Sequence, residues 1–405
     1  MAKMSMASRK DYLKQIYKRY RFAGRQDKTL ILDEFCLNTG YQRKYATRIL
    51  NEPLRLSAAR TGRSETYTGE HVYYLKKIWD ILDQPCGQRL APVLPEMIRV
   101  LKRCKELIVP PSLAEGLVKI GSATIDRRLE PFRKSVWRRI HGTTKPGSLL
   151  KKQIPIVLSR WNEKVPGYTE LDLVAHCGLS ASGEFVSTLN ITDLATGWTE
   201  SAAVLGKAQG RVFEALKTVQ RRLPFALKGL DPDNGSEFIN WQLFTYCLQQ
   251  KIQFTRGRPG KKNDNPYVEE KNWTHTRKIV GYDRLDTPDE LEILNSLYQG
   301  PLRLYLNFFQ PVMKLTKKTR VGGRLKKKYD VPQTPYRRLL KTQGVPTTKK
   351  QQLSALYESL NPVKLKADIE QHLKLLAKLV REQRELTQKK EPARVTFPMI
   401  DRIPA

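Results

Sequence analysis

The chain has 405 residues, and its 73 Lys and Arg against 40 Asp and Glu give it a formal net charge of +33 at pH 7. This length predicts two to four domains, and this charge favours a polyanionic partner whose binding weakens as salt increases. No apolar run approaches the ~20 residues of a transmembrane helix, the N-terminus has no secretory apolar segment, and the five cysteines are scattered without a Cys-x-x-Cys pair. We therefore expect a cytoplasmic protein with reduced thiols and no membrane partner.

Residues 28–51 predict two helices separated by the turn Leu37–Gly40, with the second helix over residues 41–50. Ala46, Ile49 and Leu50 recur on one face of this second helix, which is typical of a helix-turn-helix module. The polar and basic residues of the other face are candidates for contacts with DNA: Gln42, Arg43, Lys44, Thr47 and Arg48. A basic amphipathic helix in a structural bundle is the alternative interpretation.

Residues 66–108 carry Leu, Ile and Trp at helical spacing and predict a helical region. After it, residues 112–120 and 124–129 predict a second helix-turn-helix, with Gly121–Ala123 as its turn. The candidates for DNA contacts on the second of these helices are Thr124, Arg127 and Arg128. The basic residues 138–147 then predict a linker that follows a phosphate backbone.

From residue 168 onward, the pattern predicts three strands and then alternating helices and strands. The expected elements are strands at 168–176, 184–191 and 198–204, a helix at 208–222, a strand at 226–231, a helix at 236–250, a short strand at 252–256 and a helix at 264–281. This order predicts an α/β domain built on a mixed sheet. Turn residues at Gly178–Gly183 and at Asp193–Gly197 separate the first strands, so we interpret Asp193 as a structural acid.

Three acids in this region fall where a folded domain would present them together. Asp172 lies inside the first strand, Asp233 follows the strand at 226–231, and Glu269 lies near the start of the last helix. Carboxylate oxygens are the ligands that Mg²⁺ prefers, and two such ions ~3.5–4 Å apart need several of them. The alternatives are that these are ordinary surface acids, or that Glu270 takes the place of Glu269 as the third ligand.

At these residues the chain resembles the DDE transposases of bacterial insertion sequences, which share a retroviral-integrase-type, RNase H-like catalytic core. The resemblance is carried by Leu171-Asp172, by Asp233–Phe238, by Asn265–Glu269 and by the 35 residues between the second aspartate and the glutamate, and it covers about residues 160–345. It implies an RNase H-like α/β core in which Asp172, Asp233 and Glu269 bind two Mg²⁺ ions, with Mn²⁺ as a substitute.

The same resemblance implies the partners. They are double-stranded DNA, namely the terminal inverted repeats of the element and a target DNA, and further copies of the chain in a dimer or tetramer on paired ends. A bacterial, nucleoid-associated protein is expected on the same ground.

Basic residues flank Glu269 on both sides. A loop that contains Gly and Pro precedes it, and we expect this loop to close over DNA through four residues: Arg256, Arg258, Lys261 and Lys262. Trp273 and Arg277 lie four and eight residues after Glu269, on its face of the helix. We expect Arg277 to meet a phosphate, and Trp273 to pack or to stack on a base. The alternative is a solvated basic loop and a Trp in the core.

Residues 314–350 contain 13 Lys or Arg and one acid, Asp330. This charge density favours an anionic partner, and a solvated tail is the alternative. The segment also resembles the one that follows the core in related transposases, which adds four candidates for DNA contacts: Arg324, Lys326, Lys327 and Lys328. Farther on, one helix carries an apolar stripe that would dock on the core or on another protomer: Leu365, Ile369, Leu373, Leu376 and Val380.

Together these elements predict a multidomain α and α/β protein. Its expected parts are a helix-turn-helix module at 1–65, a second helical module with the basic linker at 66–150, an RNase H-like catalytic core at 160–300, and a basic C-terminal region with a terminal helix at 301–405. The activity that the resemblance implies is metal-dependent DNA cleavage and strand transfer. A transposase-derived DNA-binding regulator and an RNase H-like nuclease or resolvase without strand transfer are the alternatives. Zinc is not expected, because His176 with Cys177, and His275, lack a second pair at ligand spacing.

Overall fold

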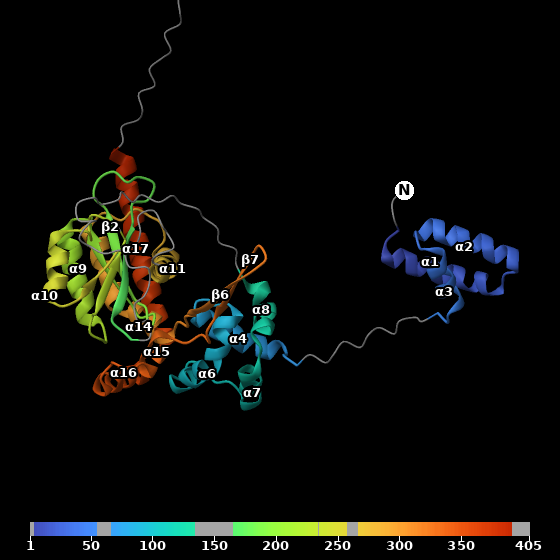
Figure 1. Cartoon of the computed structure of the whole chain (residues 1–405), viewed down its shortest axis with the longest axis horizontal. Helices are drawn as coiled ribbons and strands as arrows, with labels where there is room; N and C mark the ends of the chain where they lie inside the picture. The colour runs from blue at the N-terminus through green and yellow to red at the C-terminus, as the bar shows by residue number, and fades with distance from the viewer. Residues whose placement is uncertain (1–3, 55–65, 134–164, 234, 257–265, 391–405) are drawn as a thin grey trace, which may run out of the picture. The chain divides into compact units, whose positions relative to one another are not determined.

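The computed structural model describes residues 4–54, 66–133, 165–233, 235–256 and 266–390 (Figure 1). The chain divides into two compact units, Met1–Thr66 and Tyr67–Ala405. No helix in these ranges combines the length and the apolar character that crossing a bilayer requires.

The first unit is a bundle of three helices, α1 (Met6–Phe22), α2 (Arg25–Thr39) and α3 (Arg43–Asn51), around a core that includes the fully buried Phe35 and Leu50. The predicted turn was placed too early, because Leu37–Thr39 form the last turn of α2. Gly40 ends that helix with a φ of 70°, a left-handed conformation that glycine adopts readily, and its N–H bonds to the carbonyl of Cys36.

The second unit begins with α-helices that precede the sheet in the sequence. They are α4 (Gly69–Ile81), α5 (Gly87–Leu90), α6 (Leu94–Arg103), α7 (Pro111–Lys119) and α8 (Ser122–Leu129), with short 3₁₀ turns at Ala91–Val93 and Glu130–Phe132. Ser122 and Ala123, predicted as turn residues, are the first residues of α8. The backbones of α5 and α8 touch at Gly87, where an added Cβ would lie 2.1 Å from the carbonyl oxygen of Ser122.

A five-stranded mixed sheet lies at the centre of the second unit. Its strands are β1 (Tyr168–Ala175), β2 (Val186–Asp193), β3 (Thr199–Leu205), β4 (Gly229–Pro232) and β5 (Gln253–Phe254), in the order β3-β2-β1-β4-β5. β2 is antiparallel to its neighbours β1 and β3, whereas β4 is parallel to β1 and to β5. The predicted α/β class, the mixed sheet and the order of its elements are therefore confirmed.

Helices cover both faces of this sheet, as Figure 1 shows for α9 and α10 on one side and α14 and α17 on the other. Alternate residues of β3 point to opposite faces. Ala202 and Val204 join the apolar cluster with α9 (Gln209–Arg222) and α10 (Trp241–Gln249). Ala203 joins the cluster with α13 (Pro288–Gln299) and α14 (Pro301–Phe309).

Asp193 has the structural role that the sequence predicted. It is fully buried at the turn between β2 and β3 and accepts hydrogen bonds from the N–H groups of Gly167 and Thr196, each at 2.8 Å. The helix predicted at 236–250 instead begins at Trp241. Asn240 caps it by accepting a bond from the N–H of Leu243, and the preceding residues form a turn.

The C-terminal third folds onto the same unit. A hairpin of β6 (Leu315–Val321) and β7 (Arg324–Tyr329) is followed by α15 (Pro335–Lys341), α16 (Thr347–Ser359) and α17 (Pro362–Lys390). The alternative of a solvated segment is wrong for α15, where Tyr336 and Leu339 are buried, whereas β6 and β7 are exposed apart from the half-buried Leu315. The apolar stripe of α17 buries Leu365, Ile369, Leu376 and Val380 in the cluster of α13 and α14, so it docks on the core.

Candidate active site

Two strands bring two of the predicted acids to neighbouring positions. Asp172 lies in β1, and Leu171 beside it pairs with Pro232, the last residue of β4, so that Asp233 follows directly on the adjacent strand. Burial and the negative charge of Asp233 raise the pKa of Asp172 to about 7, and Glu269 adds to this effect. Burial also raises the pKa of Asp233. The three predicted acids therefore share one electrostatic environment.

A chain of side-chain amides fixes the carboxylate of Asp172. Its Oδ2 accepts a hydrogen bond of 2.6 Å from Asn272 Nδ2, while its Oδ1 accepts one of 2.8 Å from the N–H of Leu173. Asn190 donates to Asn272 Oδ1 at 2.7 Å, and Ser201 donates to Asn190 Oδ1 at 2.6 Å. Because Asn272 already accepts from Asn190, its NH₂ group is the end that faces Asp172.

Asp233 lies in a tight turn that holds its carboxylate. Its Oδ1 accepts a hydrogen bond of 2.9 Å from the N–H of Gly235. An added Cβ at Gly235 would stand 2.6 Å from the carboxyl carbon of Glu237, so only glycine fits here without a shift of that side chain. Burial, followed by the charge of Asp233, raises the pKa of Glu237. The charge of Lys207 opposes the rise in the pKa of both acids.

Glu269 belongs to a helix anchored at its first turn by Glu170. The helix consists of α11 (Pro266–Lys271), a π-helical turn (Asn272–Arg277) and α12 (Lys278–Val280). Glu170 Oε2 accepts hydrogen bonds from the N–H groups of Tyr267 at 2.9 Å and Val268 at 2.8 Å. Val268 is fully buried while Glu269 is exposed. Burial raises the pKa of Glu170 to about 8.

The π-helical turn changes which residues face the sheet. A π turn closes i→i+5 bonds and inserts one residue into the α-helical register. Through it, Asn272 and Thr276 both meet Asn190, whose Nδ2 lies 2.9 Å from Thr276 Oγ1. The helix predicted at 264–281 is confirmed over residues 266–280, and the π turn lies inside it.

Arg277 and Trp273 differ in their surroundings. Arg277 donates to the carbonyl of Ala175 at 2.7 Å and lies over the ring of Tyr282. Trp273 keeps 52% of its surface exposed and lies outside the core. A phosphate contact for Arg277 and a base contact for Trp273 stay predictions.

The two adjacent glutamates have different partners. Glu270 accepts a hydrogen bond of 2.9 Å from Arg89 in α5, with which it forms an ion pair. Glu269 instead acts on the pKa of Asp172 and Glu170. Of the two, Glu269 is thus the one within the electrostatic environment of the other acids.

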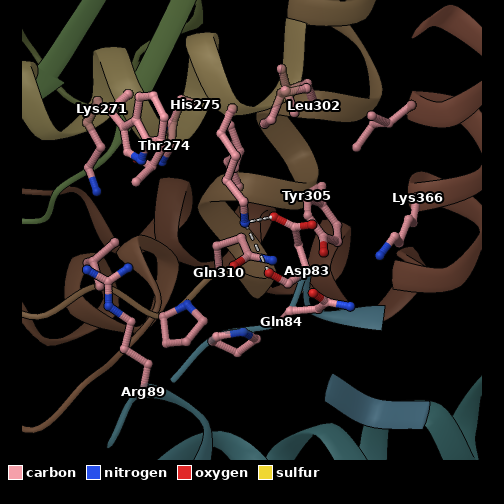
Figure 2. Close-up of a pocket in the computed structure, with 18 of the residues that line it drawn as sticks. Asp83, Gln84, Arg89, Lys271, Thr274, His275, Leu302, Tyr305, Gln310 and Lys366 are labelled. Atoms are coloured by element: carbon pink, nitrogen blue, oxygen red, sulfur yellow. Dashed lines mark hydrogen bonds and ion pairs between the residues drawn. The ribbon is translucent and has the colours of Figure 1, made fainter. Parts of the chain in front are cut away.

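The same helix is tied to the carboxyl end of α4. The last carbonyls of a helix lack partners within it, and here side chains of other elements supply donors. Figure 2 shows Tyr305 and Gln310 beside Asp83 at this end of α4. Tyr305 donates to the carbonyl of Ile81 at 2.6 Å, Gln310 to that of Leu82 at 2.8 Å, and Lys278 of α12 to that of Asp83 at 3.2 Å. Lys366 of α17 donates to the carbonyl of Asp80. These contacts border a cavity of about 570 Å³.

The candidates for DNA contacts have varied surroundings. Gln42, Arg43, Lys44 and Arg48 are exposed on α3, with Thr47 half-buried, while Arg43 pairs with Asp33 and Arg48 lies over the exposed ring of Tyr45. On α8, Arg127 is exposed, and Thr124 and Arg128 are half-buried. Arg256 is buried.

Four of the candidates for DNA contacts are exposed on the hairpin of β6 and β7: Arg324, Lys326, Lys327 and Lys328. The remaining ones, Arg258, Lys261 and Lys262, lie outside the described residues, as does the predicted linker at 138–147.

The donor chemistry of the three acids suits a hard divalent cation. Within the ranges that the structure covers, no group of three or more His, Cys, Asp or Glu is arranged to hold a metal ion. The carboxylates of Asp172, Asp233 and Glu269 nevertheless supply the oxygen ligands that Mg²⁺ prefers, and a cation would relieve the repulsion that raises the pKa of Asp172. His176 is buried, with Nε2 2.8 Å from Thr188 Oγ1.

Sequence reasoning missed Glu170, Asn190 and Asn272. Asn272 follows Glu269 by three residues, which places both on one side of a helix. Glu170 precedes Asp172 by two residues, which places both on one face of a strand. These spacings are the signals that the sequence contains, but they do not show which partners the three side chains would contact.

Comparison with known proteins gives a relative in sequence and distant likenesses to solved structures. No protein-family model matches the chain. The chain is 38% identical over 340 residues to the uncharacterized protein y4rM of Sinorhizobium fredii (strain NBRC 101917 / NGR234), an alignment that covers 83% of this chain and 96% of that protein. The catalytic core domain of HTLV-2 integrase, in complex with magnesium, has 12% identity and a TM-score of 0.26, covering 36% of this chain and 91% of its own. That of BIV integrase has 16% identity and a TM-score of 0.25, covering 42% and 91%.

Proposed function

This chain belongs to the same family as the uncharacterized protein y4rM of Sinorhizobium fredii, and we propose that it is a DDE-type transposase. It binds the ends of a DNA element and catalyses metal-dependent strand cleavage and strand transfer. The observation that supports this most directly is the pairing of β1 with β4, which places Asp172 beside the position where Asp233 follows Pro232. Burial and the charges of Asp233 and Glu269 raise the pKa of Asp172 to about 7. A buried acid whose pKa is raised by neighbouring acids is typical of functional sites.

Neighbouring residues of the chain would orient the three acids for metal binding. Asn272 and the N–H of Leu173 orient Asp172, the N–H of Gly235 orients Asp233, and Glu170 anchors the helix of Glu269. Mg²⁺ bound by the three carboxylates would supply Lewis-acid activation of the attacking oxygen and stabilise the leaving oxygen.

The proposed reaction is two in-line displacements at phosphorus. In the first, water bonds to the phosphorus at the element end and the 3′-oxygen leaves. In the second, that 3′-hydroxyl bonds to a phosphorus of target DNA and displaces a 3′-oxygen there. No covalent bond to the protein is needed, so the chain requires no nucleophilic side chain.

The charge distribution supports double-stranded DNA as the substrate. The net charge of +33 is spread over both units, and exposed basic residues lie on α3, α8 and the hairpin of β6 and β7. Such surfaces bind phosphate by displacing condensed counterions. The element ends and a target are the proposed DNA partners, and a dimer or tetramer on paired ends is the proposed assembly.

The test is the substitution Asp233→Asn, which preserves shape and removes the charge. We expect it to abolish nicking and strand transfer in Mg²⁺ while binding of the element ends stays nearly unchanged. Asp289→Asn, an exposed acid of α13, is the matched control and should behave like the wild type. Undiminished strand transfer by Asp233→Asn would defeat the proposal. If the wild-type chain nicks DNA but never joins the ends, it is a nuclease or resolvase. If it binds DNA without nicking it, it is a regulator.

A further inference from the structure

The hairpin of β6 and β7 extends beyond the core without a packed face. Twelve of its thirteen residues are exposed, and the half-buried Leu315 at its base is the exception. The strands are joined by Gly322-Gly323, with a φ of 59° at Gly322. Figure 1 draws the hairpin as an arm that leaves the body of the second unit. A lone two-stranded hairpin is only marginally stable in water.

Both faces of this arm are basic. Residues paired across the hairpin point to the same face, and the pairs Lys317–Lys328 and Lys318–Lys327 face opposite sides. The first face also carries Arg324 and Lys326, and the second carries Arg320. Within the part of the chain that the structure describes, no acid forms an ion pair with any of these seven residues. Like charges placed opposite each other destabilise a hairpin, so the arm lacks the anion that would stabilise it.

The base of the arm, in contrast, is firmly held. Lys314 and Asp330 bond to each other through Lys314 N–H to Asp330 Oδ1 at 2.7 Å and Asp330 N–H to the Lys314 carbonyl at 2.9 Å. Asp330 also pairs with the buried Arg338. The ammonium of Lys314 lies 5.8 Å from the ring centre of Tyr267, in the first turn of the helix that carries Glu269. The base of the arm thus contacts the helix that carries Glu269.

We propose that this arm inserts into the major groove of double-stranded DNA and that its two faces contact the phosphates of the two groove walls. The inference rests on the proposed function and names the surface that holds the substrate next to the acids. The major groove, about 12 Å wide, admits a two-stranded ribbon. The tip has no side chains to obstruct entry, and basic residues on both faces match a groove whose two walls are both anionic.

The experiment compares two sets of substitutions with equal charge. One replaces Lys317, Lys326 and Lys328 of the first face by Gln, and the other replaces Lys318, Arg320 and Lys327 of the second. The control replaces three exposed residues of α17 by Gln: Lys374, Lys378 and Arg381. Binding of the full chain to a mixed-sequence 30-base-pair duplex is measured against salt concentration. Each arm variant should weaken binding and make the slope of log K against log salt shallower by up to about 3, or about 0.9 per lost contact.

The groove is identified with two modified duplexes. In one, glucosylated hydroxymethylcytosine fills the major groove, and in the other netropsin fills the minor groove. The loss caused by the arm substitutions should disappear on the first duplex and persist on the second. Dependence on the minor groove, or a loss confined to one face, would overturn the proposal. Melting temperatures of the arm variants should equal or exceed that of the wild type, because the substitutions remove like-charge pairs.

These outcomes separate the arm from the proposed function. A wild-type chain that binds the duplex and nicks DNA in Mg²⁺, with arm variants that bind like the α17 control, would overturn the arm alone. A wild-type chain that neither binds nor nicks DNA would overturn both.

Discussion

Asn272 Nδ2 lies 2.6 Å from Asp172 Oδ2 and donates a hydrogen bond to it. The amide cannot turn over without losing its bond to Asn190, which lies one strand away in the sheet. The orientation of Asp172 is therefore set from outside the group of acids, by a side chain on the helix of Glu269. This link makes the geometry of two of the acids depend on each other.

Replacing Asn272 by Ala should weaken the metal dependence of the reaction without removing any acid. Loss of an outer partner of a metal ligand typically costs about 10–100-fold in metal affinity or activity. We expect the Mg²⁺ concentration for half-maximal nicking to rise within that range and excess Mg²⁺ to restore part of the rate. Thr274→Ala, two residues away on the same helix, is the control. An unchanged Mg²⁺ requirement in Asn272→Ala would contradict the role.

The adjacent glutamates can be separated by substitution. Glu269→Gln should reduce Mg²⁺-dependent nicking to background, because a ligand charge is lost. Glu270→Gln should retain nicking and lower the free energy of unfolding by no more than about 1 kcal/mol, since the partly exposed pair with Arg89 contributes little. Nicking assays and urea unfolding measure the two effects. The opposite pattern, with Glu270→Gln inactive and Glu269→Gln active, would move the third ligand by one residue.

Glu170 should act as an anchor through its acceptor oxygen. Glu170→Ala leaves the N–H groups of Tyr267 and Val268 without their acceptor and should lower the free energy of unfolding by about 1–3 kcal/mol. Glu170→Gln keeps a carbonyl oxygen in place and should remain close to the wild type. Urea unfolding followed by circular dichroism measures both. If Gln proves as harmful as Ala, the charge of the side chain is what matters.

The order of the elements followed from the sequence because each strand and helix of the core carries a strong local pattern. Three predicted strands, followed by helices and strands in alternation, indicated an α/β fold. The local errors occur where a side chain or a tertiary contact decides. Asn240 caps α10 so that it starts at Trp241, Gly40 ends α2 only after Thr39, and the π turn at Asn272–Arg277 has no signature in hydrophobic spacing.

The candidate site divides in the same way. Asp172, Asp233 and Glu269 could be proposed as site residues because a strand, a strand end and a helix start are visible in the pattern. Glu170, Asn190 and Asn272 could not, because their roles depend on pairings between residues up to 100 positions apart. No local rule reports such a pairing.

His176 should make the stability of the second unit depend on pH. Burial, followed by the charge of Arg277, lowers its pKa to about 3, from 6.5 in the unfolded chain. As pH falls, His176 therefore takes up a proton at a higher pH in the unfolded state than in the folded state. The stabilising contribution is complete above pH 6.5 and is lost toward pH 3, at up to about 1.4 kcal/mol per pH unit.

His176→Gln should flatten this dependence, measured as the difference in unfolding free energy between pH 7 and pH 5. His372→Gln on α17 is the control and should keep the slope of the wild type. A slope in His176→Gln equal to that of the wild type would show that another group titrates.

The capped end of α4 also limits where recombination between related genes could join two chains without loss of contacts. Its carbonyls are satisfied by Tyr305, Gln310, Lys278 and Lys366, and Leu75 and Trp79 share an apolar cluster with Leu302. A crossover between α8 and β1 would separate these partners and expose both surfaces to water. A crossover near Thr66 would break none of them. The three-helix bundle is therefore the part that an exchange could replace while these contacts within the second unit stay intact.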